Sequence, residues 1–135
     1  MREQSIRMQP QASSGFGSVK NIKVIEKTES SVAIEFSIPP GNPYFDGHFP
    51  EFSLLPAVAQ VELIIRFASE YLGTGIDISE MRRIKFTKFI LPDTPLLLRL
   101  EKREKNITFR IISPDDESLY SSGALTISLR KEGDK

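Results

Sequence analysis

One segment of the chain is predicted to be a long helix that other parts of the protein must surround. Residues 56–72 carry apolar side chains at helical spacing, with Pro56 suited to a first turn and Gly73 to the position just past the end. On a helix of about 25 Å, the apolar residues cover more than half of the circumference. The polar residues gather on one stripe, formed by Glu62, Arg66, Ser69 and Glu70. So wide an apolar surface predicts a helix wrapped by another structure.

The segments on both sides of this helix have the patterns of β-strands. Before it, a β-like stretch starts at Val19, turns at Glu29-Ser30, and continues as a run over residues 32–38 whose apolar side chains alternate as in a half-buried strand. After it, turn residues separate four further runs: 83–91, 96–104, 107–113 and 119–130. Two strands, a helix and four more strands predict an α+β protein, with an antiparallel sheet folded around the single helix.

The length of the chain indicates one domain. Its 135 residues are enough for one core, so residues 18–131 are predicted to form the domain, with a polar arm over residues 1–17 and a tail over residues 132–135. A formal net charge of zero leaves no excess of Lys and Arg for binding phosphates, and nucleic acid is not expected as a partner.

The absence of cysteine from the sequence excludes disulfides, thiolate metal sites and a cysteine nucleophile. The N-terminal residues lack the apolar region of a secretory signal, and no run approaches the 18 or so apolar residues of a transmembrane helix. These features predict a cytoplasmic protein without a membrane anchor.

Two residues can form an acid/base pair. His48, the single histidine, precedes the predicted helix, and Glu62 follows it by fourteen residues on that helix. Imidazole titrates near neutral pH, so a carboxyl group beside it makes a usable couple. Spacing alone favours a plainer interpretation, because loop histidines are more often structural and because Glu62, Arg66 and Glu70 have the i,i+4 spacing of a solvated ion-pair ladder.

A longer motif favours the catalytic interpretation of His48 and Glu62. Residues 44–62, YFDGHFPEFSLLPAVAQVE, resemble the signature of bacterial β-hydroxyacyl-acyl carrier protein dehydratases: a Gly-His-Phe-Pro loop, a helix start after proline, and an acidic residue fourteen positions after the histidine. Residues 84–86 and 90–96 resemble the strand and turn that follow the helix in this family, and the order of elements fits over residues 19–129. The resemblance implies the hot-dog fold, a curved antiparallel sheet around one central helix.

The resemblance also implies a reaction, the dehydration of a (3R)-hydroxyacyl thioester to the trans-2-enoyl thioester. His48 would remove the C2 proton, Glu62 of the partner chain in a homodimer would protonate the departing hydroxyl, and the Ala57 N–H would stabilise the thioester oxygen. The residues implied to surround the substrate are Gly47, Phe49, Leu54, Ala57, Val58, Phe86 and Phe89. No metal or organic cofactor is required, and assembly of dimers into a trimer of dimers is left open.

Three positions depart from the family pattern. Glu51 and Ala57 stand where glycine is usual, and Ser53 stands where proline is usual. Alanine keeps the N–H donor unless the site needs a positive φ or closer approach. A carboxylate at Glu51 near His48 would raise the pKa of the imidazole, which would weaken it as a base because more of it would already be protonated. Leu54-Leu55-Pro56 and Gln60 also resemble aryl polyene pathway dehydratases, which usually have Asp at the position of Glu62, so the subfamily stays open.

Two alternative functions remain. A hot-dog acyl thioesterase would hydrolyse the same class of substrate, although such enzymes generally lack the Gly-His-Phe-Pro loop. A non-catalytic acyl-binding relative is the second alternative, favoured by the departures at Glu51 and Ala57.

The densest basic stretch, residues 81–88, suggests how a substrate carrier could bind. Strand alternation predicts that Arg83 and Lys85 share one face, while Arg82 and Lys88 share the other with Ile84 and Phe86. Acyl carrier proteins are acidic, so Arg83 and Lys85 are predicted to contact the carrier. The alternative is a solvated strand edge.

Overall fold

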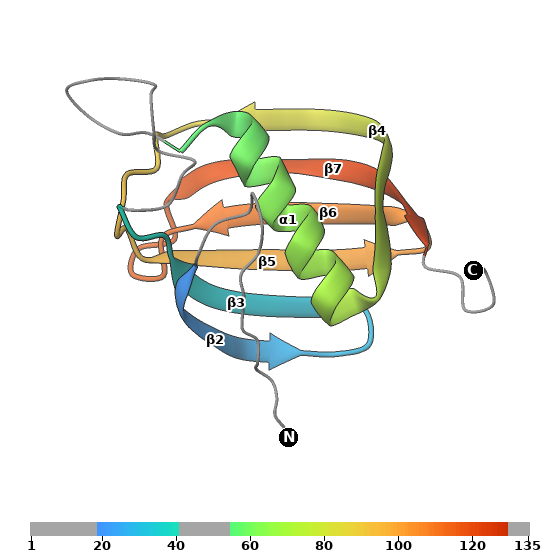
Figure 1. Ribbon diagram of the computed structural model, residues 1–135, viewed down its shortest axis with the longest axis horizontal. Helices are drawn as coiled ribbons and strands as arrows, with labels where there is room; N and C mark the ends of the chain where they lie inside the picture. The colour runs from blue at the N-terminus through green and yellow to red at the C-terminus, as the bar shows by residue number, and fades with distance from the viewer. Residues whose placement is uncertain (1–18, 41–54, 130–135) are drawn as a thin grey trace.

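The structure is a computed structural model of the chain, and it describes residues 19–40 and 55–129. In chain order the elements are β2 (Lys20–Lys27), β3 (Ser31–Ser37), α1 (Ala57–Leu72), β4 (Thr74–Phe86), β5 (Leu96–Arg103), β6 (Asn106–Ile112) and β7 (Leu119–Leu129). The strands of the described segments form one sheet in the order β2-β3-β5-β6-β7-β4, and each neighbouring pair is antiparallel (Figure 1).

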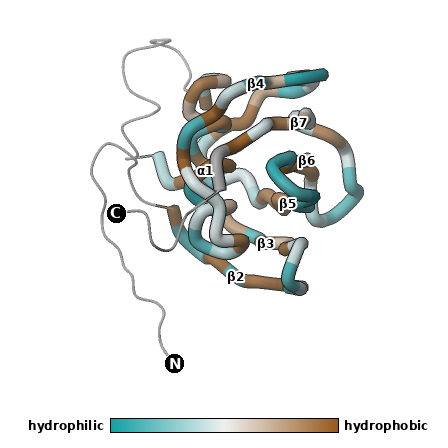
Figure 2. The backbone as a smooth tube through the Cα atoms, turned by 90° about the vertical axis from the view of Figure 1, so that its right-hand side faces the viewer, coloured by the Kyte–Doolittle hydropathy of each residue, from teal (hydrophilic) through white to brown (hydrophobic). Residues whose placement is uncertain are grey.

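Helix α1 lies against one face of this sheet, and the sheet curves around it (Figures 1 and 2). Strand β3 precedes the helix and lies near one edge, whereas β4 follows it and forms the other edge. The chain therefore crosses the whole sheet through α1. Gly73 ends the helix with φ 69°, a left-handed conformation that glycine adopts without steric penalty. The predicted architecture, a curved antiparallel sheet around a single helix, is confirmed.

The core fills the space between α1 and the inner face of the sheet. Every second residue of the central strands points inward, as shown by the complete burial of Ile34, Leu98 and Phe109. A second, smaller cluster of buried residues, Ala33, Leu97 and Ile112, packs with partly buried Leu119. These residues alternate with the inward-facing ones and so belong to the outer face. For this reason β3 is buried at Ala33 as well, and Ser37 is also buried, so the prediction of a half-buried strand there is wrong.

The predicted strand over residues 83–91 is wrong at both ends, because β4 spans Thr74–Phe86. As an edge strand, β4 buries few of its side chains, and in its first half only Ile76 and Ile78 alternate with polar residues, which is too short a run to mark a strand in a sequence. At the other end, the N–H groups of Thr87 and Lys88 both donate to the Tyr120 carbonyl, and the chain leaves the ladder. Ile90 then re-enters the core, which explains the apolar pattern beyond the strand.

Gly123 on β7 provides a test of this packing. A Cβ at this position would lie 3.0 Å from Phe109 Cε2 and 3.1 Å from Ile84 Cα, closer than real Cβ atoms normally approach. We expect Gly123→Ala to lower the free energy of unfolding by about 1–3 kcal/mol through overpacking, measured by urea denaturation. The control is Ser122→Ala, since Ser122 is its neighbour on the outer face. Equal effects of the two substitutions would contradict the close contact between β7, β4 and β6.

Candidate active site

The predicted site residues divide into two groups. His48, Gly47, Phe49 and Leu54 lie outside the described residues, as do the departures at Glu51 and Ser53. The structure describes the predicted residues that lie on α1, on β4 and in the segment after β4: Ala57, Val58, Glu62, Arg83, Lys85, Phe86 and Phe89.

The start of α1 presents backbone donors that no described side chain caps. Pro56 occupies the N-cap with φ −68° and ψ 157°, makes no side-chain capping hydrogen bond, and is followed by a first turn without acidic residues. The first N–H groups of a helix have no carbonyl partner within the helix, and the helix dipole favours negative charge beside them. The helix start, with Ala57 as its first residue, is therefore suited to an oxygen that becomes negatively charged.

Backbone contacts tie this helix start to the segment after β4. The Leu55 N–H donates to the Ile90 carbonyl at 2.9 Å, and both residues are buried. The Gln60 side chain approaches from the helix, with Nε2 3.4 Å from the Leu55 carbonyl oxygen. As a result, residues 55–58 and 87–91 lie at the same end of the molecule.

Large apolar side chains are exposed around this junction. Val58 is 72% exposed and Phe89 75% exposed, and Phe86 and Leu91 are each more than 40% exposed. Three of these four were predicted to contact substrate. Leu91 was not, because its place in an apolar run suggested a core strand. Exposed apolar side chains gathered in this way are typical of a binding surface.

Glu62 lies on the side of α1 that faces away from the sheet. It shares an exposed stripe with Val58, Arg66 and Glu70, each four residues apart, and this stripe begins at the uncapped helix start. Glu62 and Arg66 each have an interaction partner within the chain. The Glu62 Cα lies about 6 Å along the axis from that of Val58. The structure thus brings the predicted acid and the backbone donors to one end of one helix.

The basic stretch on β4 does not alternate as predicted. Arg82 pairs with Ala124 and Lys85 with Ser122, and these two partners lie two residues apart on the outer side of β7. Between them β4 has a register shift, and Arg83 adopts a φ of 53°, as the extra residue of a β-bulge does. The prediction that Arg83 shares a face with Lys85, opposite Arg82, is therefore wrong.

Lys88 also differs from its predicted place. It lies beyond the end of β4, with Nζ 3.1 Å from Ser118 Oγ and 5.0 Å from the centre of the Tyr120 ring. Arg82 has a structural role, because its guanidinium donates to Thr126 Oγ1 at 2.8 Å and to Asn106 Oδ1 at 3.0 Å. These contacts fasten β4 to β6 and β7.

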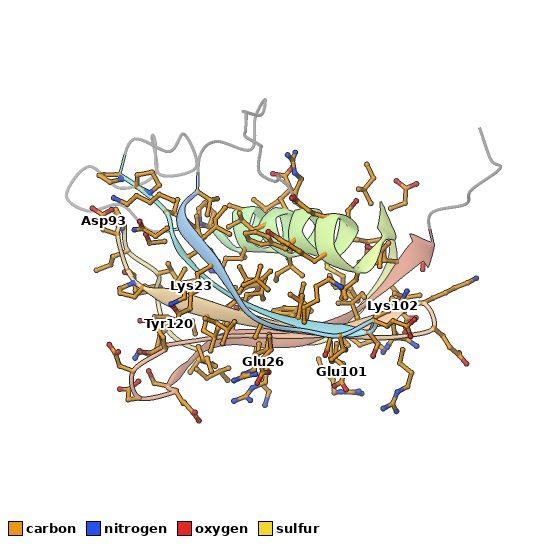
Figure 3. The ribbon with its side chains drawn as sticks, turned by 90° about the horizontal axis from the view of Figure 1, so that it is seen from below. Lys23, Glu26, Asp93, Glu101, Lys102 and Tyr120 are labelled. Atoms are coloured by element: carbon orange, nitrogen blue, oxygen red, sulfur yellow. The ribbon has the colours of Figure 1, made fainter. Side chains whose placement is uncertain are left out.

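The register of the sheet reveals a cationic row that the sequence did not indicate. Arg99 on β5 is directly opposite Arg110 on β6, Arg110 is opposite Ser122 on β7, and Ser122 is opposite Lys85. Glu26 lies 3.5 Å from Arg99 and points away from α1, as does Glu101, so the row lies on the outer face (Figure 3). We call Arg99, Arg110 and Lys85 the outer cationic row. No sequence pattern joins these residues, because they belong to three strands.

Other kinds of site have little support in the described residues. No group of three or more His, Cys, Asp and Glu residues among them could hold a metal ion. The pKa of Tyr71 is raised by burial and, to a lesser extent, by Glu70, but Tyr71 lies in the last turn of α1, far from the helix start. Within residues 19–40 and 55–129, no helix has the length and apolar character needed to cross a membrane.

Comparison with known proteins identifies the family. Residues 24–124 match the family model described as ApeI-like, ApeI dehydratase. The chain belongs to the ApeI-like dehydratase family. It is 24% identical over 119 residues to the 3-hydroxyacyl-[acyl-carrier-protein] dehydratase FabZ of Streptococcus suis, a match that covers 81% of this chain and 85% of the relative.

Solved structures agree with this family. The dehydratase heterocomplex ApeI:P from Xenorhabdus doucetiae is similar with a TM-score of 0.69 and 28% identity, over 82% of this chain and 100% of that chain. Zebrafish thioesterase superfamily member 2 is similar with a TM-score of 0.56 over 81% of each chain, and its 15% identity indicates a shared fold alone. The predicted resemblance and the predicted hot-dog fold are both confirmed.

The alanine at position 57 is compatible with the helix-start donor that the sequence resemblance implies. Ala57 is the first residue of α1 and is not among the described non-glycine residues with positive φ. Its N–H is therefore presented in an ordinary helical conformation, and glycine is not needed for the backbone to adopt it. The added methyl group changes the space at the helix start, not the donor.

Proposed function

We propose that this protein dehydrates a (3R)-hydroxyacyl thioester to the trans-2-enoyl thioester in the synthesis of fatty acids or related acyl chains. The proposal depends chiefly on one observation: in a chain of the ApeI-like dehydratase family, the uncapped start of α1 and Glu62 lie on one exposed stripe. Dehydration needs both a donor for developing negative charge and an acid for the departing hydroxyl, and this stripe carries one of each.

In the proposed reaction, the imidazole of His48 takes the C2 proton. The electron pair of that C–H bond forms the C2–C3 double bond as the C3–O bond breaks, and Glu62 protonates the hydroxyl, which leaves as water. Negative charge that develops on the thioester oxygen is stabilised by the Ala57 N–H at the positive end of the helix dipole. No oxidant, reductant or cofactor enters this balance.

We expect His48→Ala and Glu62→Gln each to lower dehydration by about 10²–10⁴-fold. Glu62 is exposed, so Glu62→Gln should change stability by no more than about 0.5 kcal/mol. The assay follows the products from a 3-hydroxyacyl thioester. Free acid and thiol instead of enoyl product would support a thioesterase, and no product would support an acyl-binding relative. Turnover close to the wild type in either variant would contradict the assigned pair.

A homodimer is the proposed active form. Strand β4 is a thirteen-residue edge of the sheet, and Ile76 and Met81 on it are 63% and 54% exposed. A long edge strand with exposed apolar side chains is prone to pair with another chain. A second copy paired along β4 would cover this edge, and in the proposed dimer Glu62 of one chain acts with the partner's His48. The ApeI:P relative is a heterocomplex, so a different related chain is the alternative partner.

Mixing inactive chains tests the shared site. In a dimer of one His48→Ala chain and one Glu62→Gln chain, one site has lost both groups and the other has retained both. An equal mixture should therefore recover about a quarter of wild-type activity, because half of the dimers are mixed and each has one intact site. Mixed dimers that stay inactive after proven subunit exchange, or a fully active monomer, would contradict this arrangement.

An acidic acyl carrier protein is the proposed bearer of the substrate, with the outer cationic row and Arg83 as its docking residues. Like charges directly opposite on neighbouring strands are destabilising, so the Arg99 and Arg110 pair is not explained by the stability of the sheet. Within the described residues, the side chains of Arg110 and Lys85 make no ion pair or hydrogen bond. A hollow of about 280 Å³ beside Arg99 and Arg110, which Glu26 and Glu101 also line, offers room for a partner's side chains.

The row is also well placed for delivery of a tethered substrate. Lys85 is next to Phe86, where β4 ends, and Phe86 is one of the exposed apolar residues near the helix start. Three strand spacings separate Arg99 from Lys85, or about 14 Å, which matches two to three turns of a helix lying across the strands. An acidic helix in this position would have its charges opposite the row.

Charge reversal separates docking from chemistry. We expect Arg83→Glu with Lys85→Glu, and separately Arg99→Glu with Arg110→Glu, to raise the apparent KM for a carrier-bound substrate by about tenfold or more. The effect should shrink at high salt and be nearly absent for a short thioester analogue. Lys23→Glu, on β2, is the matched control. Equal losses on both substrates would show that the row is structural, and no loss on either would show that it is only solvated.

A further inference from the structure

Gln60 is the polar exception on the buried side of α1. The other buried residues of this helix are apolar: Ala59, Leu63, Ile64, Phe67, Ala68 and Leu72. Gln60 is 4% exposed and lies in the first turn and a half of the helix, beside the junction with Leu55. Burial of an amide on the apolar side of a helix requires a physical reason.

The residue holds two successive carbonyl groups. Its backbone N–H donates to the Pro56 carbonyl at 3.1 Å, and its side-chain Nε2 donates to the Leu55 carbonyl at 3.4 Å. The Leu55 N–H is held by the Ile90 carbonyl on the other side. Both peptide units that lead into α1 are therefore fastened from within the helix.

Fixing these units also fixes the direction of the Ala57 N–H. A peptide unit is planar, so the Pro56 carbonyl and the Ala57 N–H point in opposite directions from one rigid plane. With the carbonyl held along the helix toward Gln60, the N–H points out of the helix start. The Gln60 side chain restrains the preceding plane, which sets the orientation of Pro56.

The rest of the side chain argues against a purely structural role. Gln60 Oε1 is buried and has no hydrogen-bond partner among the residues that the structure describes, and a buried acceptor without a donor costs free energy. An apolar side chain of similar volume would avoid that cost but would leave the Leu55 carbonyl without this donor. The two costs oppose each other, so stability alone gives glutamine little advantage over methionine here.

We propose that Gln60 is a positioning residue for the dehydration reaction. It does not touch the reacting atoms. Through the Leu55 carbonyl it holds the start of α1 so that the Ala57 N–H meets the thioester oxygen as charge develops there. The inference rests on the proposed function, and it adds a residue whose contribution is to the rate of the chemical step and not to folding.

Two variants test this role. Gln60→Met removes the unpaired oxygen together with the donor to the Leu55 carbonyl, and these two changes act on stability in opposite directions. Its melting temperature should therefore stay close to that of the wild type while kcat falls by about tenfold or more and KM changes by less than about threefold. Gln60→Glu keeps the size and shape of the side chain. Its ionised carboxylate cannot donate to the Leu55 carbonyl, but its protonated form can, and burial raises the pKa of such a carboxyl group. The ratio of its kcat to that of the wild type should therefore rise as pH falls.

Leu63→Met, one turn further along the same buried side, is the matched control and should leave kcat unchanged. The proposal is overturned if Gln60→Met keeps kcat within about twofold of the wild type, or if the ratio for Gln60→Glu does not change with pH. A loss of melting temperature in Gln60→Met that parallels the loss of kcat would mean a structural role. A wild-type protein without dehydratase turnover overturns the proposed function itself, whereas an active wild type with equally active variants overturns only the role of Gln60.

Discussion

Burial of α1 against the curved sheet is the constraint on which the rest of the structure depends. The helix covers the sheet diagonally because it joins β3, near one edge, to β4 at the other. Its inner side is held by apolar packing, which includes the rings of Phe67 and Phe36, with centroids 5.2 Å apart. Its start is held by the hydrogen bond from the Leu55 N–H to the Ile90 carbonyl. The same burial leaves one stripe of α1 outside the core. The uncapped donors and Glu62 occupy that stripe, so the packing that stabilises the fold also presents the candidate chemistry.

The periodic and apolar parts of the fold could be predicted from the sequence, and the edges could not. Helix α1 and its end at Gly73 follow from spacing and from the conformational freedom of glycine, and Glu62 follows from a motif. Strand β4 was misplaced because an edge strand buries too little to show alternation. The faces of Arg82 and Lys85 were misassigned because one extra residue in a bulge, Arg83, reverses the expected order. The position of His48 relative to Glu62 remains a prediction.

Tertiary register explains the two features that no sequence pattern indicated. Arg99 and Arg110 are eleven residues apart, and they are neighbours only because β5 and β6 form a hairpin with that pairing. Gln60 is one of several polar residues on α1, and its burial follows from the direction in which the helix crosses the sheet. In both cases the informative quantity is a cost to stability: two like charges placed opposite each other, with Glu26 paired to one of them, or a buried acceptor without a donor among the described residues. Such costs point to functional surfaces because folding alone does not explain them.

The departure from the family pattern at Ala57 leaves the donor of the proposed site in place. Alanine at position 57 keeps the backbone donor, since the residue begins α1 without a positive φ, and the methyl group takes up space beside the exposed side chain of Val58. In the proposed function, its effect would therefore be on which acyl thioesters fit at the helix start. Charge stabilisation there depends on the direction of an N–H group and not on the side chain that follows it. A restraint on that direction, supplied from inside the helix by Gln60, leaves the side chain at position 57 free to vary while the donor stays in place.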